Sequence, residues 1–135
     1  MSMGFTILIQ DAVSDVVEQA RVETSADVLA HLNGYDWAGE RAREAALGEA
    51  YCSPQLAVAN ESSGNVLHII PEEDGNYEIW FHTDGPARKL LGLIPLPRAS
   101  ALYTSSKATK DTVQAAIDHF LKDNKHWFEK TFQKD

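Results

Sequence analysis

Apolar and polar positions in the first part of the chain predict a strand followed by a helix. The run Phe5-Thr6-Ile7-Leu8-Ile9 is rich in β-forming residues and predicts a strand over 5–9, with an extension toward Val13 left open. Thr24, with Asp27 three residues later, resembles a capping box, and apolar residues then recur at helical spacing over 28–34, up to an Asn-Gly pair. We therefore expect a helix to begin immediately after residue 24.

Two further helices are predicted from their caps and their apolar spacing. Asp36 is a candidate cap for a helix from residue 37 to about residue 47. Thr109 is a candidate cap for the clearest helix of the chain, whose apolar positions are Val113, Ala116, Ile117, Phe120 and Leu121. This stripe either continues through Asn124 to Phe128, or the helix breaks near Asn124.

Between these helices, turn residues separate three runs of β-forming residues. Residues 55–59 alternate, residues 66–70 form the next predicted strand, and residues 77–83 form the returning one. Asp74-Gly75 is a hairpin signal, because a type I′ turn needs positive φ at both of its central positions. The three runs therefore predict an antiparallel meander, to which residues 99–105 are a further candidate strand.

A two-residue turn at Asp74-Gly75 sets the expected register of the hairpin. It places Ile70 opposite Ile79 and His68 opposite Phe81 on one face, and it leaves the other face to Leu67, Ile69, Trp80 and His82. Both faces then carry apolar groups. We therefore expect one face to meet helices and the other to be partly covered.

Length and composition agree with one folded domain. The chain has 135 residues, of which 44% are apolar and 24% are charged, an ordinary globular balance. We expect a single domain over 1–135 of the α+β class. Its antiparallel meander sheet would have about four to five strands, with the N-terminal helices and the C-terminal amphipathic helix packed on it.

The formal net charge of −8 is unevenly distributed along the chain. Residues 1–100 hold fifteen acidic and six basic residues, whereas residues 101–135 hold five acidic and six basic ones. This distribution argues against direct binding of nucleic acid and suits a basic protein partner, although charge also serves solubility alone. No apolar run has the length of a membrane helix, and a lone cysteine excludes an internal disulfide, so we expect a cytoplasmic protein.

The candidate catalytic and metal-binding residues form no recognisable motif. The five histidines lack HExxH spacing, and His68 and His82 are expected on opposite faces of the hairpin, so we predict no metal site and no cofactor. Cys52 would be a nucleophile only beside a histidine, and a lone cysteine is more commonly a small buried hydrophobe. We therefore predict a protein that binds a partner rather than an enzyme.

The hairpin holds the candidate partner-binding residues. Its acidic tip is either a solvated turn or a contact surface for a basic cleft. Trp80 is a candidate interface anchor, although tryptophan is also a common core residue in small domains. The predicted partner surface consists of Glu72, Glu73, Asp74, Tyr77, Trp80 and His82.

The order of elements, with several residue types, resembles a known family. Gln55-Leu56-Ala57-Val58 opens the meander, and Gly75-Asn76-Tyr77-Glu78-Ile79-Trp80-Phe81 closes its hairpin. A late strand then precedes the helix over 109–121, and Trp127 follows that helix. Over about residues 55–130 this order resembles the small immunity proteins of bacterial polymorphic toxin systems, especially the family found beside deaminase-type toxins.

The resemblance implies a protein that binds one cognate toxin and neutralises it through an acidic surface that blocks the toxin's active site. The toxin would be basic or directed at nucleic acid, and the chain would be a monomer or a homodimer without membrane contact. Two alternatives stay open. One is a secretion chaperone for an effector protein, which the predicted N-terminal strand disfavours. The other is a small-ligand-binding domain or an enzyme with an unrecognised pocket.

Overall fold

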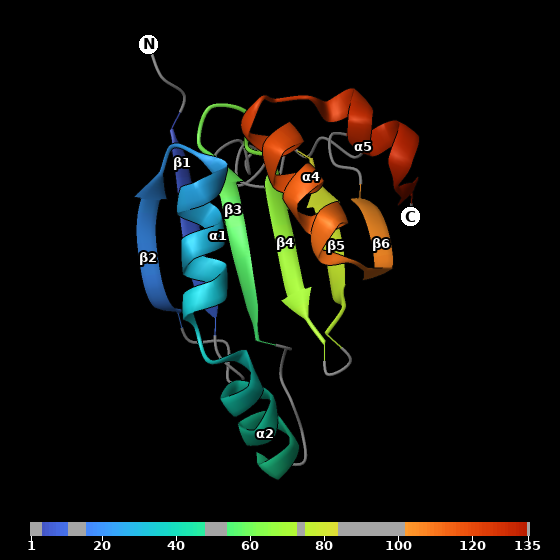
Figure 1. Ribbon diagram of the computed structural model, residues 1–135. Coiled ribbons are helices and arrows are strands. Elements are labelled where there is room, and N and C mark those ends of the chain that lie inside the picture. The colour runs from blue at the N-terminus through green and yellow to red at the C-terminus, as the bar shows by residue number, and fades with distance from the viewer. Residues whose placement is uncertain (1–3, 11–15, 48–53, 73–74, 84–101, 135) are drawn as a thin grey trace, which may run out of the picture.

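The computed structural model describes residues 4–10, 16–47, 54–72, 75–83 and 102–134. They form a seven-stranded antiparallel sheet in the order β2-β1-β3-β4-β5-β6-β7, with α1 and α4 against one face (Figure 1). The strands are β1 (Phe5–Gln10), β2 (Val16–Val22), β3 (Gln55–Asn60), β4 (Val66–Pro71), β5 (Tyr77–His82), β6 (Leu102–Ala108) and β7 (Gln133–Lys134). The helices are α1 (Ser25–Gly34), α2 (Trp37–Leu47), α4 (Lys110–Leu121) and α5 (Lys125–Thr131). The α+β class is confirmed, whereas the predicted count of four to five strands is too low.

The strands that the sequence pattern misses lie at the two edges of the sheet. β2 has a polar centre, Glu18-Gln19, and so shows no run of β-forming residues, yet it pairs along the whole of β1. β7 has only two residues, and it pairs with Tyr103 and Thr104 of β6. Because β1 also pairs with β3, the N-terminal hairpin joins the predicted meander into one sheet.

The helix starts agree with the predicted caps. The Thr24 hydroxyl accepts from the N–H of Asp27 at 3.2 Å, and the Asp27 carboxylate accepts from the N–H of Thr24, so the capping box is complete. Asp36 accepts from the N–H of Gly39 at 3.0 Å, and Thr109 caps α4. At the far end α4 stops at Leu121, because the chain turns at Asp123, which has φ +57°. Of the two predicted possibilities, the structure therefore shows the helix break near Asn124, and α5 begins after this break.

The apolar core lies between the sheet and helices α1, α4 and α5. The sheet contributes fully buried side chains from its central strands, namely Ile7, Ile9, Leu56, Val58, Leu67, Ile69 and Ile79. The helices contribute buried residues from the stripes that the sequence predicts, with Val28 and Leu32 from α1 and Val113, Ala116, Ile117 and Phe120 from α4. α5 adds Phe128, whose ring stacks on Phe81 at a centroid distance of 4.1 Å.

The β4–β5 hairpin differs by one residue from the register expected from the sequence. The N–H of Glu72 donates to the carbonyl of Asn76 at 2.9 Å, and Gly75 has φ +82°, so three residues connect the strands instead of two. His68 therefore lies opposite Trp80, and Ile69 lies opposite Ile79. Since a one-residue slip turns a strand's side chains to the other face, the predicted face assignment is wrong. Leu67, Ile69, Ile79 and Phe81 all lie in the helix-covered core, and His68, Trp80 and His82 share the opposite face.

The capping box of α1 allows a local test of this fold. Thr24→Ala removes the acceptor for the Asp27 N–H, and we expect the free energy of unfolding to fall by about 1 kcal/mol. Urea unfolding followed by circular dichroism measures this change. Thr24→Ser is the matched control, because it keeps the hydroxyl and should unfold within about 0.5 kcal/mol of the wild type. Equal losses in both variants would contradict the role of the hydroxyl.

Candidate functional site

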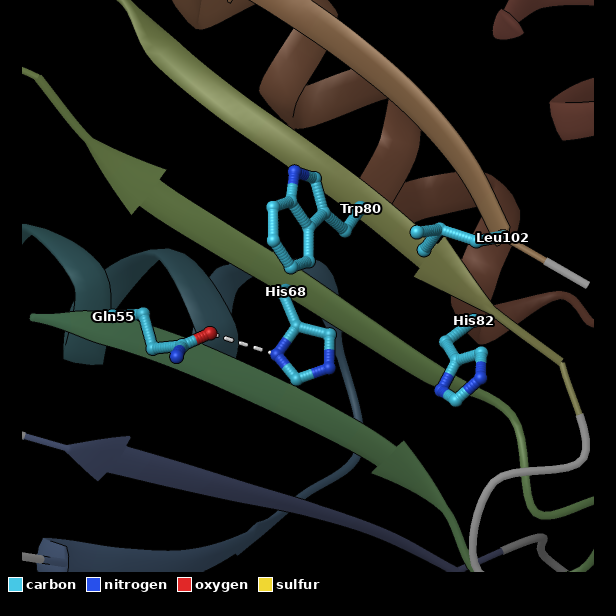
Figure 2. Close-up of a pocket in the computed structure, with 5 residues that line it drawn as sticks. All are labelled: Gln55, His68, Trp80, His82 and Leu102. Atoms are coloured by element: carbon cyan, nitrogen blue, oxygen red, sulfur yellow. Dashed lines mark hydrogen bonds between the residues drawn. The ribbon is translucent and has the colours of Figure 1, made fainter. Parts of the chain in front are cut away.

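A hollow lies on the second face of the sheet, which we define as the face opposite α1 and α4. It has a volume of about 220 Å³. Five side chains from four neighbouring strands line it, namely Gln55 of β3, His68 of β4, Trp80 and His82 of β5, and Leu102 of β6 (Figure 2). Most of this lining is apolar, and the side chains with polar atoms are the two histidines, Gln55 and Trp80. Such a mixture is typical of small binding sites.

The strand register brings these side chains together. His68 pairs with Trp80 across β4 and β5, and His82 pairs with Leu102 across β5 and β6. Side chains that are opposite in an antiparallel pair lie on the same face, and diagonal neighbours on that face remain within reach of long side chains. The expectation that His68 and His82 lie on opposite faces is therefore wrong, because it depended on the two-residue turn.

His68 is held in one orientation by Gln55. Its Nδ1 lies 2.7 Å from Oε1 of the Gln55 carboxamide. With the amide oriented in this way the oxygen only accepts, so Nδ1 carries the proton of the neutral ring and Nε2 keeps its lone pair. Figure 2 shows Nε2 on the side of the ring that faces His82. Within the described residues, nothing donates a hydrogen bond to this nitrogen.

Burial keeps the His68 ring neutral. Loss of hydration, the larger cause, and the nearby His82, the smaller one, together lower the pKa of His68 to about 4. At neutral pH the hollow therefore contains an uncharged hydrogen-bond acceptor in apolar surroundings. Such an acceptor favours a ligand group that can donate a hydrogen bond without bringing a charge.

Trp80 forms the most exposed wall of the hollow. Its ring lies edge to face with His68, with centroids 6.3 Å apart. Trp80 is 37% exposed, and among the described residues it is the only exposed large apolar side chain. Tryptophan with one free surface is enriched where proteins bind partners.

The structure divides the predicted partner-binding residues between two faces. Trp80 and His82 line the hollow, whereas Tyr77 lies on the helix-covered face, packed against the core. Glu72 is partly buried at the end of β4. Glu73, Asp74 and the candidate nucleophile Cys52 lie outside the described residues. Sequence reasoning missed Gln55, His68 and Leu102. The correct hairpin register would have placed His68 beside Trp80, whereas Gln55 and Leu102 come from the strands that flank the hairpin.

The other hollows of the described chain have less chemical definition. A depression of about 530 Å³ at β1 and β2 contains the ion pair between Arg21 and Glu61, at 3.4 Å, and both side chains are largely in water. A hollow of about 150 Å³ between α1 and α4 contains Tyr77, Lys110 and Gln114. Across the ranges given above, no three residues among histidine, cysteine, aspartate and glutamate cluster as they would around a metal ion.

Comparison of the chain with family models, with curated proteins and with solved structures found no match. None of the helices in the described ranges has the length and apolar character needed to cross a membrane.

Proposed function

We propose that the protein binds a partner protein through the second face of its sheet and that it acts as an immunity protein, neutralising a cognate toxin. The observation that carries this proposal is the exposure of Trp80. This side chain lines the hollow, on the face of the sheet that α1 and α4 do not cover. A large, rigid aromatic side chain in this position supplies binding energy when a partner removes it from water.

The charge of the chain has a separate role in this proposal. A net charge of −8 attracts a basic partner over several ångströms and repels acidic competitors, and so it acts mainly on the association rate and on specificity. Glu78 adds an acidic group on the same face as Trp80, since it pairs with Ile70 in the same register. The proposed interface thus combines an apolar anchor with a neighbouring acidic side chain, and no catalytic step is assigned to the chain.

The test begins with the protein encoded beside this chain. If that neighbour has a toxic C-terminal domain, co-expression of the chain should restore growth, and the purified pair should form a 1:1 complex. A neighbour that stays toxic and does not co-purify with the chain would contradict the immunity proposal.

Trp80→Ala tests the face on which the partner docks. We expect the affinity for the toxin domain to fall roughly 30-fold or more, equivalent to about 2 kcal/mol, as for other interface anchors. Isothermal titration calorimetry measures this loss, and circular dichroism confirms that the variant is folded. Gln114→Ala is the control, because Gln114 is exposed on α4, on the other side of the sheet. An unchanged affinity in Trp80→Ala would exclude the second face as the interface.

A further inference from the structure

We propose that the hollow recognises a phenol ring, with the hydroxyl between His68 and His82, and that its occupant is a tyrosine side chain of the partner protein. The choice of a partner's side chain as the occupant depends on the function proposed above. The chemistry of the hollow itself does not depend on it.

The size of the hollow limits its occupant. Pockets for drug-sized ligands measure roughly 300–1,000 Å³, whereas this hollow measures about 220 Å³. A single substituted ring fits this volume better than an extended ligand. Trp80 and Leu102 provide apolar walls for such a ring, and aromatic pairs add attraction beyond the burial of area.

The polar atoms specify what the ring must carry. Gln55 holds the Nδ1 side of His68, so the lone pair of Nε2 is directed away from Gln55, toward the side where His82 lies (Figure 2). A ring without a donor would bury this acceptor unpaired, which is costly in apolar surroundings. An ammonium group would lose more hydration than one imidazole returns. An uncharged hydroxyl satisfies the site.

The second histidine favours a hydroxyl over a group that only donates. A hydroxyl donates one hydrogen bond and accepts others, whereas an indole N–H only donates. With its proton directed to Nε2 of His68, the oxygen of a phenol can accept from a ring N–H of His82, which lines the same hollow. Tyrosine is the side chain that combines this hydroxyl with an aromatic ring.

A pair of small probes tests this inference on the whole wild-type chain. p-Cresol carries the tyrosine ring and hydroxyl, and toluene is the same molecule without the oxygen. We expect p-cresol to bind at least tenfold more tightly than toluene, and we expect it to shift the ¹⁵N resonances of the His68 ring in NMR spectra. A merely apolar hollow would give the opposite order, because toluene is the more hydrophobic probe. That order, no binding of p-cresol at its solubility limit, or a His68 ring that does not respond would each overturn the inference.

His68→Leu extends the test, because it removes the acceptor and keeps an apolar wall. The variant should lose the preference for p-cresol, and a preserved preference would exclude His68 as the acceptor. If the variant does not fold, the wild-type probe order and the His68 shift still decide the question.

Competition identifies the source of the phenol. Saturating p-cresol should weaken binding of the toxin domain if a partner's tyrosine occupies the hollow. Binding of p-cresol without competition would overturn the assignment to the partner and indicate a free phenol as the ligand. Toxin neutralisation without any p-cresol binding would overturn this inference alone, whereas p-cresol binding without neutralisation would overturn the proposed function.

Discussion

Phe128→Ala should lower the free energy of unfolding by about 3–5 kcal/mol, the range for truncating a buried phenylalanine. Phe128 is 1% exposed and stacks on Phe81. It also forms T-shaped pairs with Trp127 and Phe132, with ring centroids 4.9 and 5.4 Å apart. Helix α5 has seven residues, and its N-cap, Asn124, makes no side-chain capping bond. So short a helix is marginal by itself, and its place on the core depends on this ring.

Urea denaturation at neutral pH measures the loss, and Lys130→Ala in the same helix is the matched control. Lys130 is exposed, so its removal should change the free energy of unfolding by no more than about 0.5 kcal/mol. A Phe128→Ala variant that loses less than about 1 kcal/mol would show that the ring stack contributes little beyond surface contact.

Acidification should destabilise the wild-type protein through His68. Its pKa is about 4 in the folded chain, against 6.5 for an unperturbed imidazole. Between these values the unfolded chain binds a proton that the folded chain does not, so lowering the pH favours unfolding. The contribution of His68 to this loss should reach about 2 kcal/mol at pH 5, relative to pH 7 and above.

His68→Gln isolates this contribution, because glutamine does not titrate. The stability difference between wild type and variant should shift by about 2 kcal/mol in favour of the variant when the pH falls from 7 to 5. His126→Gln is the control, since the side chain of His126 is 76% exposed. The difference in free energy of unfolding between this variant and the wild type should stay the same when the pH falls from 7 to 5. A His68 ring that titrates near 6.5 in an NMR pH series would contradict the burial of its charge.

The helices were predictable because their signals are local. Thr24 with Asp27, Asp36, and Thr109 each cap a helix within three residues of their own position, so the sequence contains the whole interaction. The core faces of α1 and α4 follow from the same short-range spacing. These features need no knowledge of the rest of the chain.

The site was not predictable in the same way, because its assembly depends on pairing between strands. A three-residue connection with Gly75 at φ +82° replaced the expected Asp74-Gly75 turn, and this single residue moved His68 to the side of Trp80 and His82. Gln55 and Leu102 reach the hollow only because β3 and β6 flank the hairpin. β2 and β7 were missed because polar or very short edge strands leave no apolar run in the sequence.

The outer part of β6 has a consequence for association between molecules. β7 pairs with only two residues of β6, Tyr103 and Thr104. Farther along β6, Lys107 has φ +55°. It lies near the irregularity in the β5–β6 register, which falls between Tyr77 and Ile79 of β5. A twisted edge that carries a lysine is a poor template for another strand, and natural sheets use such edges against aggregation. A partner that approaches this end of the sheet therefore meets side chains, and it gains little by lengthening the sheet with a strand of its own.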